Sequence, residues 1–378
     1  MTVRRSRALQ RRGLLPAVLL AVLVAACAGG DGGGASTAPS GSGASTSTSP
    51  SDPGGGASGA ASQSAAASAS LAAGEFENPV IDRNFADPFI LAADGTYYAY
   101  ATGDLTVNIQ VSTSPDLVTW SARKEALPKL PLWQPVSKGL TWAPEVIKTD
   151  AGYVMHYTTR DVQAGRQCLS VGVAEAPEGP FKDTSEEPLE CQVDLGGSID
   201  SSPFRDEDGS LWLVWKNDGN CCGKHTHFYL APLDDDGTSL TGDAVDLGLD
   251  NDRGWEGNVI EAPQIVRHGD TYYLFYSAND YGSKRYAVGY ATASKLAGPY
   301  TDAEENPILE TAGEAAGPGH QTFLVDDDGE PWMAYHAWDA ARVGDSLGGR
   351  RALWLDRLTW EGDTPVIHGP TADPQPVP

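Results

Sequence analysis

One pattern of apolar and polar positions recurs five times along the chain. Each copy opens with a polar or Pro-containing start, continues with an apolar pair, turns at Asp or Gly and ends in an apolar, aromatic run. The copies span residues 87–100, 143–156, 202–215, 262–275 and 321–334. Two apolar runs around an Asp-Gly-type turn are typical of a β-hairpin. Each copy therefore predicts two antiparallel strands.

The spacing of the copies is nearly constant. The equivalent positions Pro88, Pro144, Pro203, Pro263 and Thr322 are separated by 56, 59, 60 and 59 residues. Further strand-like runs, such as 107–111 and 286–292, lie between the copies, which indicates about four strands in each unit. Repeated four-stranded units are typical of propeller blades. We therefore predict an all-β, five-bladed β-propeller.

Two other all-β folds fit this pattern less well. A β-sandwich does not require a hairpin at constant spacing, and the repeat of a β-helix is far shorter. No stretch has a helical period of convincing length.

The first 75 residues are of a different kind. Five arginines between positions 4 and 12 precede an apolar run, 14–24, that is too short to span a bilayer comfortably. Small residues then lead to Cys27, which resembles the lipobox of bacterial lipoproteins, where the cysteine carries the lipid; an ordinary cleaved signal peptide is the alternative. The following residues are almost entirely Gly, Ser, Ala and Thr, a composition typical of a flexible coil. We expect a lipoprotein signal peptide at 1–26, a Gly/Ser/Ala-rich tether at 27–75, a catalytic propeller at 76–372 and a tail at 373–378.

The formal net charge of −25 narrows the choice of partner. An acidic surface repels phosphate backbones, so nucleic acid is excluded as the natural ligand, and polyanionic substrates are disfavoured. A neutral sugar fits best. The ten tryptophans are compatible with sugar stacking, although most large aromatic residues simply fill cores.

The chain has five cysteines, and four remain if Cys27 carries lipid. In an exported chain an even number permits disulfides. Cys168–Cys191 is the first pairing we consider, which would leave Cys221 and Cys222 as a vicinal disulfide. A metal site is less favoured because paired C-x-x-C spacing is lacking.

The start of the first strand in each blade is the place to look for chemistry. In a propeller these strands line the central channel, so residues at their starts converge at one mouth. The residues concerned are Asp87, Trp142 with Glu145, Asp200 with Ser201, Glu261 and His320. Each alone has a structural explanation, such as a turn residue or a core histidine. Three converging carboxylates, however, raise one another's pKa, so one can stay protonated as an acid while another is ionised as a base. Glycoside hydrolysis uses such a pair of an acid and a base.

At this point the motifs resemble glycoside hydrolase family 43. The segments that carry the resemblance are 84–88, 198–201, 255–263, 317–321 and 349–354, in that order and at blade spacing. The resemblance implies that Asp87 is the general base, Glu261 the general acid and Asp200 the group that tunes the acid's pKa. Glu256 lies five residues before Glu261, and we assign the acid to Glu261 because its place relative to Pro263 matches the repeat.

The resemblance also implies an inverting mechanism, for which Asp87 and Glu261 should lie roughly 6.5–9.5 Å apart. It implies that Arg351 contacts the substrate or the catalytic acids, and we add Trp142, Trp255 and Glu256 as residues that could contact the sugar. No cofactor is required, although a Ca or Na ion could lie in the central channel near His320.

The function expected from these features is an exo-acting α-L-arabinofuranosidase on pentose-containing plant cell-wall polysaccharides or their oligosaccharides. Endo-arabinanase and β-xylosidase use the same machinery and are the alternatives. A propeller that binds glycans without cleaving them is an alternative of another class, but a pure binder does not need three converging acids. The first 75 residues predict an enzyme held by its N-terminal lipid on the outer face of the cell membrane, or else secreted.

Overall fold

The computed structural model describes residues 71–134 and 138–378. The expected signal segment, Cys27 and most of the tether therefore lie outside the described residues. In the described part no helix is long and apolar enough to cross a membrane, and the helical content is limited to three short 3-10 turns, η1 (Val193–Leu195), η2 (Gly219–Cys222) and η3 (Asp345–Leu347).

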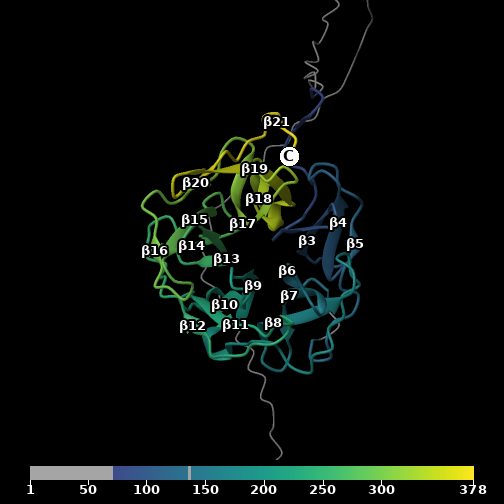
Figure 1. Ribbon diagram of the computed structural model, residues 1–378, viewed down its shortest axis with the longest axis vertical. Helices are drawn as coiled ribbons and strands as arrows, with labels where there is room; N and C mark the ends of the chain where they lie inside the picture. Colours follow the sequence, from purple (N-terminus) through teal and green to yellow (C-terminus); the bar gives the residue numbers. More distant parts are fainter. Residues whose placement is uncertain (1–70, 135–137) are drawn as a thin grey trace, which may run out of the picture. The chain divides into compact units, whose positions relative to one another are not determined.

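Five antiparallel sheets are arranged in a ring around a central channel (Figure 1). Their strands are, from first to last, β2 (Phe89–Ala93), β3 (Thr96–Thr102), β4 (Ile109–Ser114) and β5 (Lys124–Glu125); β6 (Trp142–Thr149), β7 (Gly152–Asp161) and β8 (Arg166–Ala174); β9 (Ser198–Arg205), β10 (Leu211–Asn217), β11 (Phe228–Pro232) and β12 (Val245–Asp246); β13 (Ile260–His268), β14 (Thr271–Ala278), β15 (Ala287–Ala293) and β16 (Thr301–Asp302); β17 (Ala315–Val325), β18 (Pro331–Asp339), β19 (Arg351–Glu361) and β20 (Thr364–Ile367). The all-β, five-bladed propeller is confirmed. Each blade is a meander, because hairpin turns connect neighbouring strands. The second blade has three strands rather than four, and one bridge between Val173 and Lys182 stands where the outer strand would be.

The two ends of the propeller are joined to each other. A short strand, β1 (Glu75–Phe76), pairs with β21 (Gln375–Pro376). Close by, the Asn78 side chain donates to the Leu355 carbonyl and accepts from the Leu355 N–H, both at 2.9 Å. Residues 375–376, which lie in the expected tail, thus form a strand with residues 75–76, at the expected end of the tether.

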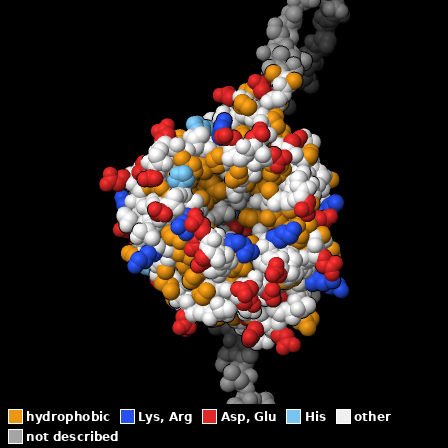
Figure 2. Space-filling view, in the orientation of Figure 1, with side chains coloured by type: hydrophobic (Ala, Val, Ile, Leu, Met, Phe, Trp, Pro, Cys, Tyr) orange, Lys and Arg blue, Asp and Glu red, His pale blue; other side chains and the backbone are white. Residues whose placement is uncertain are grey.

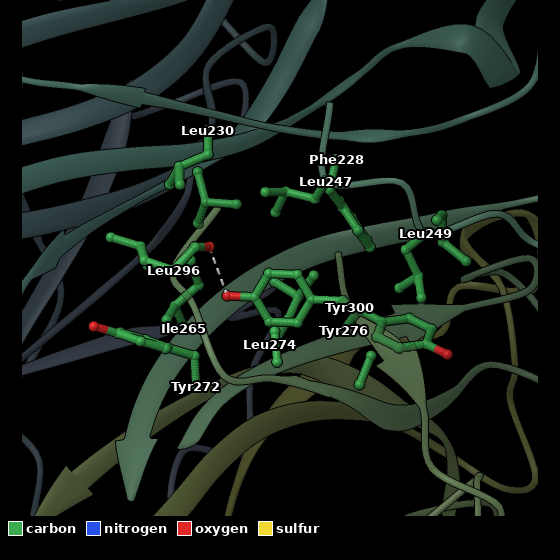
Figure 3. Close-up of a cluster of buried hydrophobic side chains, with 14 of the residues drawn as sticks. Phe228, Leu230, Leu247, Leu249, Ile265, Tyr272, Leu274, Tyr276, Leu296 and Tyr300 are labelled. Atoms are coloured by element: carbon green, nitrogen blue, oxygen red, sulfur yellow. Dashed lines mark hydrogen bonds between the residues drawn. The ribbon is translucent and has the colours of Figure 1, made fainter. Parts of the chain in front are cut away.

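The core lies between neighbouring blades. Figure 3 shows the cluster between the third and fourth blades, where Phe228 and Leu230 of β11 face Leu274 and Tyr276 of β14. The hydroxyl of Tyr300 donates to the Leu296 carbonyl at 3.0 Å, so its polar atom is satisfied inside the cluster. Alternating apolar positions on both faces of each blade make this packing possible, because every blade is covered by two neighbours.

One residue near the start of each inner strand adopts the left-handed backbone conformation. The five residues are Asp87, Ala143, Asp200, Ala262 and His320, with φ of 55°, 45°, 56°, 52° and 51°. Strand register shifts close to this point in the second, third, fourth and fifth blades, as it does at a β-bulge. Such conformations are uncommon outside glycine and concentrate at functional sites.

The backbone N–H of this left-handed residue is bound by the preceding blade. In four cases the acceptor is a side chain of that blade's second strand. The pairs are Asp87 with His336, Ala143 with Thr102, Asp200 with Thr158 and His320 with Ser277, at 3.1, 3.0, 3.2 and 2.7 Å. The first pair joins the fifth blade to the first, so these bonds help to close the ring at the end where the inner strands begin.

Candidate active site

The three carboxylates singled out by the sequence lie at one end of the channel. Asp87 immediately precedes the inner strand of the first blade, Asp200 lies in β9 and Glu261 in β13. Asp200 is held against the segment that carries Glu261, because its Oδ2 accepts the N–H of Ala262 at 3.1 Å. Asp87 and Asp200 are each about 9% exposed, so both are desolvated but remain reachable from the channel. Figure 2 shows a hollow at the centre of the ring and acidic side chains spread over the outer surface.

Asp87 has four polar neighbours. Arg351 donates from Nη1 to Asp87 Oδ1 at 3.0 Å, and the hydroxyl of Thr102 donates to Oδ2. The Nδ1 atoms of His320 and His336 each lie 3.4 Å from Oδ1. Burial alone would raise the pKa of Asp87, but the guanidinium of Arg351 and the Thr102 hydrogen bond outweigh it and hold this pKa well below its usual range. The group is therefore a carboxylate at neutral pH, the form that a general base requires.

Arg351 is itself held in place by aromatic rings. Its guanidinium carbon lies 4.8 Å from the ring centre of Tyr281 and 5.7 Å from that of Trp338. Contacts of this kind orient a guanidinium while leaving its N–H groups free to donate. Of the two contacts that the resemblance implied for Arg351, substrate or a catalytic acid, the structure has the contact with the carboxylate of Asp87.

His336 is neutral and has a defined tautomer. Burial holds the pKa of His336 well below its ordinary value. Its Nδ1 accepts the N–H of Asp87 at 3.1 Å, so the ring proton lies on Nε2. The ring is parallel to that of Tyr286, with centres 5.8 Å apart. This stack links the surroundings of Asp87 to those of Glu261.

Glu261 accepts two hydrogen bonds from buried donors. The hydroxyl of Tyr286 donates to Oε1 at 2.7 Å, and Nζ of Lys216 donates to Oε2 at 3.1 Å. Burial, followed by the charge of Glu261, raises the pKa of Tyr286 well above its ordinary range, so its hydroxyl remains a donor. Burial also raises the pKa of Asp200, with a further contribution from the negative charge of Glu261. The pKa values of Asp87 and Asp200 are thus shifted in opposite directions, as expected for acids with different tasks.

Two further buried carboxyls lie near this group. Burial raises the pKa of Glu145 to about 8, and Asp200 adds to the effect. The side chain of Glu145 accepts from the Ser202 hydroxyl at 2.7 Å. Burial likewise raises the pKa of Asp218 to about 6, against the opposing charge of Lys216.

The remaining residues that the sequence singled out fall into two groups. Trp142 begins β6 and is half-buried, with Nε1 donating to the Gly139 carbonyl at 3.3 Å. His320 is 7% exposed and lies beside Asp87, as described above. Within residues 71–134 and 138–378, no group of three or more His, Cys, Asp or Glu side chains is arranged to hold a metal ion.

Glu256 and Trp255 differ from the expectation that they contact sugar. Glu256 is completely buried, and its carboxyl accepts from the Arg253 N–H and the Tyr276 hydroxyl, at 2.8 and 2.7 Å. Trp255 packs against the hydrophobic cluster between the third and fourth blades, with its ring 5.6 Å from that of Tyr276. Both side chains turn into the blade because Gly289 leaves the space that the indole fills. This geometry leaves Glu261, not Glu256, among the converging acids.

The four described cysteines form two disulfides, Cys168–Cys191 and Cys221–Cys222. The first links β8 to the segment that precedes η1. The second lies within η2, the connection between β10 and β11. Cys221 and Cys222 are exposed.

Sequence reasoning missed four residues that contact the acids: Thr102, Lys216, Tyr286 and His336. Three of them occupy the same place in their blades, near the end of the second strand. The signal that could have found Thr102, Lys216 and His336 is their spacing, which follows the repeat of the inner strands. Tyr286 lies in a connecting loop and carries no such signal.

Known proteins resemble this chain over nearly the whole propeller. The family model for glycosyl hydrolases family 43 matches residues 76–365. A β-D-galactofuranosidase of Aspergillus niger is 26% identical over 301 residues, which cover 74% of this chain and 81% of the relative. An extracellular exo-α-(1→5)-L-arabinofuranosidase of Streptomyces avermitilis is 28% identical over 324 residues, covering 79% of this chain and 64% of the relative. The crystal structure of a thermostable family-43 glycoside hydrolase is 31% identical, with a TM-score of 0.71, and the match covers 80% of this chain and 99% of that one. Because the family match runs through all five blades, this chain belongs to glycosyl hydrolase family 43.

Proposed function

We propose that the protein is an inverting, exo-acting α-L-arabinofuranosidase. The observation that carries this proposal is the arrangement of Asp87 and Glu261, two carboxyls that are held by separate sets of donors at one channel mouth. Asp87 is paired with a guanidinium, and Glu261 is placed between a tyrosine hydroxyl and a lysine. One side is suited to activating water, the other to giving a proton to the leaving oxygen.

In this mechanism Asp87 takes a proton from water as that water attacks the anomeric carbon. Glu261 gives its proton to the glycosidic oxygen, and the electron pair of the breaking C–O bond stays on that oxygen. Asp200 is held against the Glu261 segment by the N–H of Ala262, and we assign to it the tuning and positioning of the acid. Half-buried Trp142 could form a sugar-stacking wall at the mouth.

Two observations favour a furanose ring as the substrate. His320 lies beside Asp87, and the segment 317–321 that contains it resembles the corresponding segment of arabinose-active members of the family. The relatives described above are also named for arabinofuranose and galactofuranose. We therefore keep a β-D-galactofuranosidase as the second candidate, with endo-arabinanase and β-xylosidase behind it.

A substrate panel tests the proposal. We expect aryl α-L-arabinofuranoside to be hydrolysed at least about tenfold faster than aryl β-D-galactofuranoside or aryl β-D-xyloside, because a pocket fitted to one ring discriminates by roughly 10–200-fold. Release of aryl alcohol is followed by absorbance, and proton NMR follows the anomer released first, which should be the inverted one. The Asp87→Asn variant is the inactive control, because it should lose turnover whatever the aryl leaving group. Cleavage of linear arabinan without aryl release would identify an endo-enzyme, and binding without cleavage of any substrate would favour the glycan-binding alternative.

We further propose that the enzyme works outside the cytoplasm, attached through Cys27. The arabinofuranosidase relative is described as extracellular, which supports export. Full-length protein expressed in a bacterial host with lipoprotein processing should fractionate with membranes, and the Cys27→Ala variant should be recovered in the soluble fraction. Membrane association of both proteins would contradict the lipid attachment.

A further inference from the structure

Neighbouring blades are joined through one position near the end of the second strand of each blade, and one of the five residues at this position departs from the pattern. In each blade from the second to the fifth, this position pairs across the hairpin with the residue that precedes the left-handed one. The pairs are Thr158 with Trp142, Lys216 with Ile199, Ser277 with Glu261 and His336 with Gly319. In the first blade Thr102 donates its N–H to the Ala86 carbonyl at the same place. We call residues 102, 158, 216, 277 and 336 the bracing positions.

Four bracing positions carry a side chain that accepts the N–H of the next blade, and the third blade carries Lys216 instead. An ammonium has three donors and no acceptor, so Lys216 cannot do what Thr, Ser and neutral His do there. The N–H of Ala262 is bound by Asp200 Oδ2. Asp200 thus performs the bracing task, and Lys216 is free to serve another.

The task of Lys216 is visible in its contacts. The side chain is completely buried, and Nζ donates to Glu261 Oε2 at 3.1 Å and to Asn220 Oδ1 at 2.9 Å. Burying a lysine without a compensating charge is costly. The carboxyl of Glu261 supplies that charge, which indicates that the two side chains act together.

The position of Asn220 is fixed by the short helical turn η2. It lies in η2 between Gly219 and the disulfide Cys221–Cys222. The N–H of Lys224 donates to the Gly219 carbonyl at 2.9 Å and closes the turn. A Cβ on Gly219 would lie 2.4 Å from the His225 carbonyl, so the backbone packs too closely there for another residue. Asn220 therefore presents its amide to Lys216 from a rigid support.

We propose that Lys216, held by Asn220, is a positioning residue for proton transfer from Glu261. This inference rests on the proposed function. When Glu261 gives up its proton, the electron pair of the O–H bond stays on the carboxylate. The charge then lies between the ammonium of Lys216 and the hydroxyl of Tyr286, two donors already in place. Preorganised donors stabilise a developing charge without rearrangement of solvent.

The test compares two leaving groups on the glycone that the wild-type enzyme cleaves. Phenyl glycosides need protonation of the leaving oxygen, whereas 2,4-dinitrophenyl glycosides leave without it. Since general acid catalysis contributes about 10²–10⁴-fold, Lys216→Met should lower kcat on the phenyl glycoside by about 30-fold or more. On the dinitrophenyl glycoside we expect a change of no more than about threefold, with KM unchanged on both. A purely structural role would lower both rates alike.

A second variant keeps the test decisive if Lys216→Met does not fold. Asn220→Ala leaves the lysine in place and should show the same selective loss, smaller in size. Lys224→Ala is the matched control, because Lys224 is an exposed cation near the same turn whose Nζ donates to the Asp194 carbonyl; it should retain both activities. Equal losses on the two leaving groups, or no loss in either variant, would overturn the inference. Failure of the wild-type enzyme to cleave any glycoside would instead overturn the proposed function.

Discussion

Replacing Asp87 by Asn should abolish turnover while the propeller remains folded. An amide cannot accept a proton from water, so the loss should be at least about 10³-fold in kcat, within the range for removal of a general base. The backbone should tolerate the change, because Asn adopts the left-handed conformation more readily than most residues. Arg351 would lose its carboxylate partner but keep its stacking on Tyr281 and Trp338, so we expect a moderate fall in melting temperature only.

A comparison of two leaving groups also distinguishes the role of Asp87 from that of Glu261. A variant that lacks the base cannot activate water, so Asp87→Asn should be inactive on phenyl and 2,4-dinitrophenyl glycosides alike. Glu261→Gln, which lacks the acid, should lose the phenyl activity and retain much of the dinitrophenyl activity. Near-UV circular dichroism and thermal unfolding check the fold. An Asp87→Asn enzyme that stays active, or one that does not fold, would show that the residue is structural.

The second large effect should be on stability rather than turnover. Replacing Glu145 by Gln should make the protein more stable at alkaline pH. Burial raises the pKa of Glu145 from 4.5 to about 8, so the folded state holds this proton more tightly than the unfolded state. Its contribution to stability is therefore complete below about pH 4.5 and is lost progressively as the pH rises through about 8.

The amide variant does not titrate and should lack this loss. Each pKa unit is equivalent to about 1.4 kcal/mol, so the stability difference in favour of Glu145→Gln should grow by about 2–5 kcal/mol between pH 5 and pH 9. Urea unfolding at several pH values measures it. Burial also raises the pKa of Asp218 and of Asp356, each to about 6. These two groups make the stability of both wild type and Glu145→Gln fall as the pH rises. The exposed Glu186→Gln serves as control, and a parallel pH dependence of Glu145→Gln and wild type would contradict the prediction.

Much of the fold could be predicted because its signals are local. Strand alternation and Asp-Gly turns act within about ten residues, and their recurrence at nearly constant spacing indicates the number of blades. The same spacing placed Asp87, Asp200 and Glu261 at equivalent points of three inner strands. A propeller brings such points together by symmetry, so the convergence of the acids needed no knowledge of side-chain packing.

Other features depended on contacts between distant segments. The tail at 375–376 becomes a strand only because residues 75–76 provide its partner. We expected Trp255 and Glu256 to contact the sugar, but the indole of Trp255 fills the space beside Gly289 and the hydroxyl of Tyr276 binds the buried carboxyl of Glu256.

The sequence by itself determined the number of blades, the end of the channel that carries the chemistry and the carboxylates that meet there, because these follow from a repeated local pattern. Only the tertiary structure decided what surrounds each carboxylate. Arg351 lies 264 positions from Asp87 and Lys216 lies 45 positions from Glu261. Those contacts arise when different blades close into a ring, and they decide which carboxyl keeps its charge and which is flanked by buried donors. The repeat along the chain could have marked the place of Lys216 in its blade, but not which carboxyl its side chain binds, because a repeat records positions in sequence and not contacts across the channel.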